Sequence, residues 1–82
     1  MTTEEAKKII KNEGLYRFNL YNDHRLKENE VGIRIGNSNH WEVYVTDERA
    51  SFVQGSITIF DNESDALENF IKRLRTEKIL FQ

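Results

Sequence analysis

The sequence contains no cysteine and only two histidines, His24 and His40, among its 82 residues. Without cysteine the chain can form no disulfide, no thiolate metal site and no thiol nucleophile. The two histidines could complete a closed zinc site only with help from carboxylates, and they lack the helical His-x-x-x-His spacing of a zinc protease. Single histidines in polar loops and at strand ends are usually solvated. We therefore expect neither a metal nor a cofactor.

Long apolar runs and an excess of one charge are also missing. No apolar stretch approaches the ~18–20 residues needed to cross a membrane. The first twenty residues contain Glu4, Glu5 and Glu13 and no apolar run, which is unlike a secretory signal. The net charge is −2, with acids and bases interspersed, so no field steers the chain toward nucleic acid or an anionic membrane. These features predict a cytoplasmic protein that binds neither.

The chain contains no recognisable catalytic motif. Its serines lie outside any Gly-x-Ser-x-Gly sequence, and Gly32-x-x-x-Gly36 falls within a predicted strand with no phosphate-binding loop around it. The acids near residues 61–68 lack the glycine and the spacing of a calcium loop. A domain of this length buries only about 60–65% of the surface that its unfolded chain exposes, which leaves no room for a deep cavity. We therefore expect that the protein is not an enzyme.

Residues 3–13 and the segment from about Asn62 predict amphipathic helices. Thr2-x-x-Glu5 has capping-box spacing, and Gly14 stands where a left-handed residue ends a helix. The second helix carries one wide apolar stripe, and Asp61 or Asn62 can cap it. Residues 77–82 are expected to form a loosely packed tail. Their Leu-Phe-Gln end resembles what a viral protease leaves behind, so the tail could be native or a remnant of expression.

The first three predicted strands are residues 15–21, 31–35 and 41–45. The last two of these form the best-defined hairpin. Residues 15–21 place Tyr16, Phe18 and Leu20 on one side. Residues 31–35 and 41–45 also alternate, and a three-residue loop at 37–39 puts all their apolar side chains on one face. This register pairs Ile33 with Val43, and Arg34 with Glu42. It also lets the ring of Tyr44 cover Gly32.

The fold prediction is a single α+β domain over residues 1–82, in the order α-β-β-β-β-α. Residues 51–60 form the fourth strand, with Ile57 and Ile59 pointing inward. Consecutive short connections predict a four-stranded antiparallel meander with both helices on one face. The expected core consists of Ile9, Ile10, Phe18, Leu20, Ile33, Ile35, Trp41, Val43, Val45, Ile57, Ile59, Leu67, Phe70, Ile71 and Leu74.

The face of the sheet that the helices do not cover is then available to bind a partner. It is expected to expose Arg17, Asn19, Tyr21, Arg34, Glu42, Tyr44, Thr46, Ser56 and Thr58. Tyrosine and arginine among small polar residues is typical of protein-binding hot spots, although an ordinary exposed sheet has the same composition. The same aromatics could stack nucleic-acid bases, but the acids nearby and the net negative charge argue against that.

One segment resembles a known family. Trp41-Glu42-Val43-Tyr44, followed by Thr46, Glu48 and Arg49, resembles the Trp-Glu-Val-Tyr-plus-turn segment of small immunity proteins from bacterial polymorphic toxin systems. The similarity continues through Phe60-Asp61, two acids, Ala66 and the closing helix, and it covers roughly residues 30–75. The family pattern has an aromatic residue at Val45 and a glycine just after Arg49, where this chain has Ala50.

The resemblance implies a non-catalytic, cytoplasmic protein that neutralises a cognate toxin by stoichiometric binding. The residues proposed to contact the toxin are Tyr21, Arg34, Glu42, Tyr44, Asp47 and Glu48. The three acids are expected to face a basic toxin cleft. Tyr44→Ala is predicted to weaken binding by more than about 1 kcal/mol with little loss of stability. The alternative is a small regulatory or scaffold module that could form a homodimer through an open sheet edge.

Overall fold

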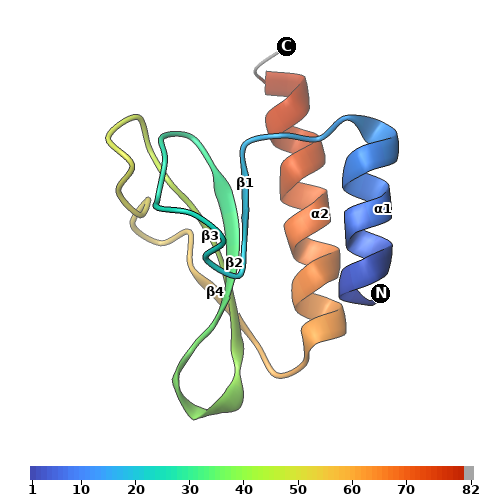
Figure 1. The fold of residues 1–82 in the computed structure, drawn as a ribbon. Coiled ribbons are helices and arrows are strands. Elements are labelled where there is room, and N and C mark those ends of the chain that lie inside the picture. The colour runs from blue at the N-terminus through green and yellow to red at the C-terminus, as the bar shows by residue number, and fades with distance from the viewer. Residues whose placement is uncertain (81–82) are drawn as a thin grey trace.

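The computed structural model describes residues 1–80, in which two helices and a four-stranded sheet follow the predicted order. Both helices lie on the same face of the sheet (Figure 1), where α2 packs on β2, β3 and β4, and α1 packs on α2. This α+β arrangement confirms the prediction. The elements are α1 (Thr3–Glu13), β1 (Phe18–Leu20), β2 (Val31–Ile35), the 3-10 turn η1 (Asn37–Asn39), β3 (Trp41–Val45), β4 (Thr58–Phe60) and α2 (Glu63–Leu80).

Helix α1 has both of the predicted caps. The Thr2 hydroxyl accepts a hydrogen bond from Glu5 N at 3.1 Å, and the Glu5 carboxylate accepts one from Thr2 N at 2.9 Å. This reciprocal pair satisfies N–H groups that a helix start leaves without a partner. At the other end Gly14 adopts the left-handed conformation, with φ 64°. Ala6 and Ile10 form the buried side of the helix.

Helix α2 begins as predicted but runs further. Asn62 caps it, because its Oδ1 accepts a hydrogen bond from Asp65 N at 2.8 Å. The helix continues to Leu80, where the sequence predicted a loosely packed tail. The last turns of α2 contact the C-terminal end of α1. Arg75 forms an ion pair with Glu13 at 2.6 Å, and the Lys78 ammonium donates a hydrogen bond to the Glu13 carbonyl. Residues 81 and 82 lie outside the described residues.

The central hairpin has the register that the sequence predicts. Ile33 pairs with Val43, Arg34 with Glu42 and Gly32 with Tyr44. The connection is the three-residue turn η1, in which Ser38 and Asn39 take left-handed φ values of 62° and 57°. This odd loop length keeps both apolar sets on the helix side of the sheet.

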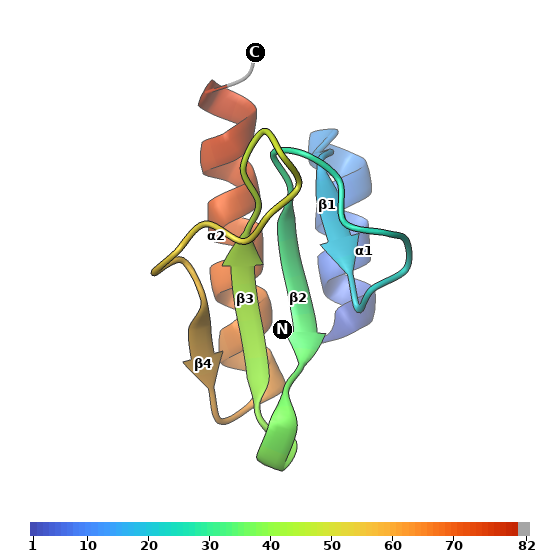
Figure 2. The same cartoon turned by 90° about the vertical axis from the view of Figure 1, so that its left-hand side faces the viewer.

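The sheet is mixed, so the prediction of a purely antiparallel meander is wrong. Strand β1 runs parallel to β2, pairing Phe18 with Val31 and Leu20 with Ile33. The chain between the two strands, residues 21–30, returns along the sheet as a loop (Figure 2). Alternation fixes which side chains share a face, but it is the same for parallel and antiparallel neighbours. The direction of β1 was therefore not determined by the pattern.

Strand β4 presents the opposite face from the one predicted. It pairs Ile59 with Glu42 and Thr58 with Val43, so Ile59 points away from the helices and Thr58 toward them. Arg73 of α2 explains this choice. Its guanidinium donates to Ser56 O at 2.8 Å and to Thr58 Oγ1 at 2.7 Å, and burial lowers its pKa. The side of β4 that faces α2 thus combines Thr58, which bonds to the Arg73 cation, with Phe60, which packs against the core.

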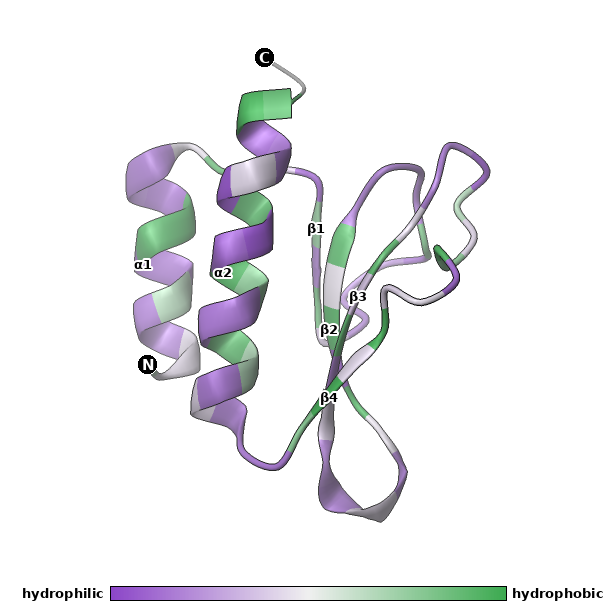
Figure 3. Ribbon diagram, turned by 180° about the vertical axis from the view of Figure 1, so that it is seen from behind, coloured by the Kyte–Doolittle hydropathy of each residue, from purple (hydrophilic) through white to green (hydrophobic). Residues whose placement is uncertain are grey.

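The core lies between the sheet and the helices, and hydrophobic segments alternate with hydrophilic ones along both helices (Figure 3). Three predicted core residues are exposed instead: Ile35 (64%), Ile57 (40%) and Ile59 (59%). Ile35 lies at the hairpin end, which extends past the helices (Figure 1). The other two follow from the orientation of β4. Four residues of the hydrophobic core cluster that the prediction omitted are Ala6, Leu15, Val31 and Ala66.

Candidate binding surface

The side of the sheet that faces away from α1 and α2, here called the outer face, is only partly open. Two loops, residues 21–30 and 46–57, lie over it (Figure 2). Three side chains predicted to be exposed there are buried: Asn19, Tyr44 and Thr46 are 0%, 0% and 2% exposed. The prediction that this face is open throughout is therefore wrong. Strand alternation assigns a side chain to a face, but it does not show which loops fold back over that face.

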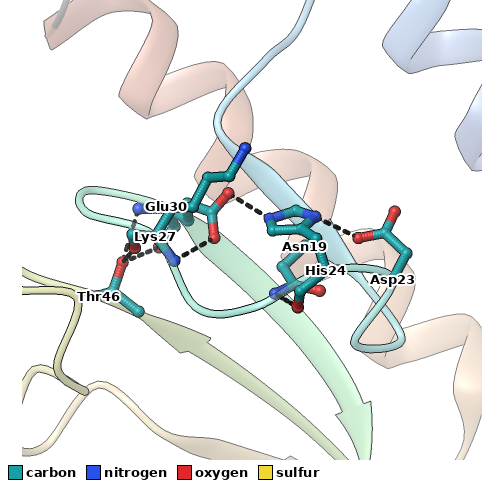
Figure 4. A network of polar contacts seen from close by, with 6 residues as sticks. All are labelled: Asn19, Asp23, His24, Lys27, Glu30 and Thr46. Carbon is teal, nitrogen blue, oxygen red and sulfur yellow. Dashed lines mark hydrogen bonds and ion pairs between the residues drawn. The ribbon is translucent and has the colours of Figure 1, made fainter.

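Buried Glu30 organises the first of these loops (Figure 4). One of its carboxylate oxygens accepts a hydrogen bond from Lys27 N at 3.0 Å. The other lies 2.7 Å from Nε2 of His24, whose Nδ1 lies 2.5 Å from Asp23. Both carboxylate oxygens of Glu30 are therefore bonded within the protein, as a buried carboxylate requires.

The same loop is tied to the neighbouring strands (Figure 4). The Thr46 hydroxyl donates to Lys27 O at 2.7 Å and accepts a hydrogen bond from Glu30 N at 2.8 Å. The Asn19 amide on β1 donates to His24 O at 3.2 Å. These bonds explain why Asn19 and Thr46 are buried, and they make the loop a fixed part of the surface. A cavity of about 620 Å³ lies beside it, lined by Arg17, Phe18, His24, Leu26, Lys27, Glu28, Glu30 and Ala50.

Tyr44 lies at the centre of a stack on the outer face. Its ring covers Gly32 so closely that a Cβ atom there would lie 2.5 Å or less from two ring carbons and the hydroxyl oxygen. The edge of Phe52 meets the ring with centroids 4.9 Å apart and an interplanar angle of 89°. Burial raises the pKa of Tyr44, and its hydroxyl has no hydrogen-bond partner among residues 1–80. The predicted cover over Gly32 is present, but Tyr44 itself is enclosed.

Arg34 and Glu42 lie beside this stack, paired as predicted. The Arg34 Nε donates to Glu42 Oε1 at 2.7 Å, and Nε2 of His40 lies 3.0 Å from Glu42 Oε2. The Arg34 guanidinium lies 5.3 Å from the centroid of Tyr44 and 4.7 Å from that of Phe52. Hydrogen bonds from His40 and Arg34 lower the pKa of Glu42. The pair is thus held in one geometry by contacts on several sides.

The turn after β3 fixes the position of Phe52. Asp47 shapes it, because its Oδ1 accepts hydrogen bonds from Arg49 N at 2.8 Å and Ser51 N at 3.0 Å. The same bonds lower the pKa of Asp47. A backbone bridge between Thr46 and Phe52 then returns the chain to β3. Of the two turn acids predicted to contact a partner, Asp47 is engaged in the turn and Glu48 is exposed.

Ala50 in this turn has a left-handed φ of 61°, at the position where the family pattern has a glycine. We expect Ala50→Gly to raise the free energy of unfolding by about 0.5–1 kcal/mol, because relief of the Cβ clash exceeds the entropy that glycine loses on folding. Thermal and urea unfolding measure this gain. Ala6→Gly in α1 is the control and should lower stability by about 2 kcal/mol, because the low helix propensity of glycine adds to the loss of a buried methyl group. A loss of stability in Ala50→Gly would contradict the strain argument.

An apolar border follows the open part of the outer face. Ile59 lies opposite Glu42 on β4, and Ile57, also exposed, lies in the loop just before the strand. Phe52, 37% exposed, adds an aromatic edge next to Arg34. Sequence reasoning assigned both isoleucines to the core and did not select Phe52. The available signal was the alternation of residues 57–60, which allows either face and is decided by Arg73.

Tyr21 lies on the helix side, so its predicted place on the outer face is wrong. Strand β1 ends at Leu20, and Tyr21 adopts a left-handed φ of 56° that breaks the alternation. Its hydroxyl donates a hydrogen bond to Glu63 in the first turn of α2. Burial and the neighbouring Glu63 carboxylate raise the pKa of Tyr21 to about 12. Tyr21 therefore connects the sheet to α2.

This pKa predicts a loss of stability in strong alkali. Because the folded value lies above the ordinary value of 10.0, the stabilisation is complete below pH 10 and is lost as the pH rises through 12. Tyr21→Phe should remove this part of the pH dependence. The measurement is the free energy of unfolding of both proteins across that range. Parallel curves for the two proteins would show that the Tyr21–Glu63 contact does not contribute.

The outer face thus brings together Arg34 and Glu42 of the predicted site, with Asp47 and Glu48 in the adjoining turn. Within residues 1–80 no group of three or more histidine, aspartate and glutamate side chains is arranged to hold a metal ion. None of the described helices is long and apolar enough to cross a membrane.

Comparison with known protein families gives a match over nearly the whole chain. The family model described as Immunity protein 59 matches residues 3–80. No curated protein and no solved structure shows a significant match to the chain. The predicted resemblance to small immunity proteins is confirmed, and the match includes α1 and β1, which the resemblance did not cover.

Proposed function

Because the chain belongs to the Immunity protein 59 family, we propose that it is a non-catalytic protein that neutralises a cognate bacterial toxin by stoichiometric binding. It acts in the cytoplasm of the cell that makes the toxin. The binding surface is the open part of the outer face. It comprises Arg34, Glu42, Phe52, Ile57 and Ile59, with Glu48 at its margin.

The observation that carries this proposal is an arginine fixed beside exposed apolar side chains. Ile59 is 59% exposed on β4, whose Thr58 side faces α2, and Ile57 is 40% exposed in the loop that precedes β4. Exposed apolar side chains around a positioned arginine are the composition of a binding hot spot, where the border excludes water from the centre. The bonds that tie both outer loops to the sheet also limit the ordering that binding requires.

Co-expression tests the function directly. The probe is the C-terminal domain of the protein encoded immediately upstream, expressed with and without this chain in a bacterial host. We expect that cells survive only when both are made, and that the two proteins co-purify in a 1:1 complex. Survival without co-purification, or death of cells that contain both proteins, would overturn the proposal.

A matched pair of isoleucines tests the surface. Ile59→Gln on the outer face should weaken toxin binding at least 10-fold, because it places an amide in the apolar border. Ile79→Gln makes the same change at a 74% exposed position near the end of α2 and should bind like the wild type. Isothermal titration calorimetry gives both affinities. Equal losses, or a loss only at Ile79, would place the interface elsewhere.

The open edge of the sheet supports a second candidate function, that of a regulatory module that forms a homodimer. Strand β4 is an edge strand that carries exposed Ile59, with exposed Ile57 just before it, and such an edge can pair with another chain. Sedimentation equilibrium of the free protein tests this. A stable dimer that Ile59→Gln dissociates, in a protein that does not bind the toxin, would favour this candidate.

A further inference from the structure

We infer that Arg34 receives an aspartate or glutamate side chain of the toxin, and that this charge pair is the centre of the interface. The inference rests on the proposed function and specifies the chemistry of its partner. It also reverses the charge expectation drawn from the sequence, in which Glu42 and the turn acids face a basic cleft.

The guanidinium of Arg34 is already in place for such a contact. Its Nε is bonded to Glu42, and its plane lies near the rings of Tyr44 and Phe52 at 5.3 and 4.7 Å. Its two terminal amino groups have no hydrogen-bond partner among the residues that the structure describes. A guanidinium presents these donors in a rigid fork that matches a carboxylate. The side chain is 29% exposed, so a partner can reach it.

Glu42 cannot serve as the free charge of this surface. Its two oxygens are bonded to Arg34 and His40, and its side chain is only 15% exposed. Its role is to orient Arg34. The available charge at the centre of the outer face is therefore positive, which is complementary to an acid.

The apolar border makes the pair effective. Phe52 lies against the Arg34 guanidinium, and Ile59 lies opposite Glu42 on the neighbouring strand. When a toxin surface covers them, water leaves the centre and the new charge pair is screened less by solvent and salt. An exposed pair on an open sheet would add little affinity.

Substitutions at Arg34 test the inference against the same toxin domain. Arg34→Gln removes the charge and should weaken binding at least 30-fold, and Arg34→Lys, which keeps the charge without the fork, at least 10-fold. Lys8→Gln, a matched loss of charge on the exposed side of α1, should bind like the wild type. Thermal unfolding of each variant separates a lost contact from a lost fold.

A charge exchange identifies the partner group. Each surface aspartate and glutamate of the toxin domain is replaced in turn by arginine and titrated with Arg34→Glu. We expect one toxin variant to lose binding to the wild type and to recover at least 10-fold with Arg34→Glu. If Arg34→Gln binds normally while Ile59→Gln does not, the carboxylate inference is wrong, but the proposal that the outer face binds the toxin is retained. If neither substitution weakens binding, both the carboxylate inference and the proposed binding surface are wrong. If the wild-type protein does not bind the toxin domain, the proposed function itself is wrong.

Discussion

Gly32→Ala is expected to lower the free energy of unfolding by about 3 kcal/mol, at the upper end of what overpacking usually costs. The new Cβ would lie 2.5 Å or less from two ring carbons of Tyr44 and from its hydroxyl oxygen. The ring has no free direction to move, because Gly32 lies on one side and Phe52 and Arg34 cover the other. A small domain has only about 5–10 kcal/mol of stability in total, so the change should be plain in urea and thermal unfolding.

Gly36→Ala is the control for this substitution. A Cβ there would meet Glu42 Oε2 and His40 Nε2 at 2.6 Å, and both atoms are the far ends of side chains that can rotate. We expect a loss of less than about 1 kcal/mol. If the two alanine variants are equally stable, the close packing of Tyr44 on Gly32 is not important for stability.

Tyr44→Ala should lower the free energy of unfolding by about 3–5 kcal/mol, the range for removal of a large buried aromatic side chain. This revises the expectation from the sequence, which treated Tyr44 as an exposed anchor whose loss would affect binding alone. With Tyr44 0% exposed, any effect on toxin binding must pass through the rings and the guanidinium that it supports. Binding and unfolding measured on the same preparation should both change.

Tyr44→Phe separates the ring from its hydroxyl. The hydroxyl is buried with no hydrogen-bond partner among residues 1–80, and removal of such a group is neutral or stabilising within about 1 kcal/mol. The phenylalanine variant should therefore fold and bind toxin like the wild type. A large loss of stability would mean that the hydroxyl has a bonded partner, such as an ordered water.

The alternation of side chains between the two faces of the sheet made the central hairpin predictable. What alternation does not determine explains the errors in the other strands and in the loops. The register of β2 and β3 follows from alternation together with an odd loop, so Arg34 and Glu42 were paired correctly from the sequence. For β4 the alternation allows two orientations, and the choice depends on Arg73, which lies fifteen residues after Thr58 on α2. No local pattern contains that information.

The candidate site was predictable only where strands form it. Loop residues 21–30 and 46–57 bury Tyr44, Asn19 and Thr46 through contacts such as those of Phe52 and Glu30. These contacts join residues with no common periodicity. Tyr21 shows a related limit, since a single left-handed residue at the end of β1 turned its side chain to the opposite face.

The clamp that Arg75 and Lys78 form on Glu13 has a consequence for synthesis. Helix α1 is made before α2, the helix on which it packs. An isolated eleven-residue helix is marginal in water. The nascent chain must therefore keep its N-terminal segment unstructured until translation reaches the second helix. Under the proposed function, toxin binding therefore requires copies in which both helices have been made.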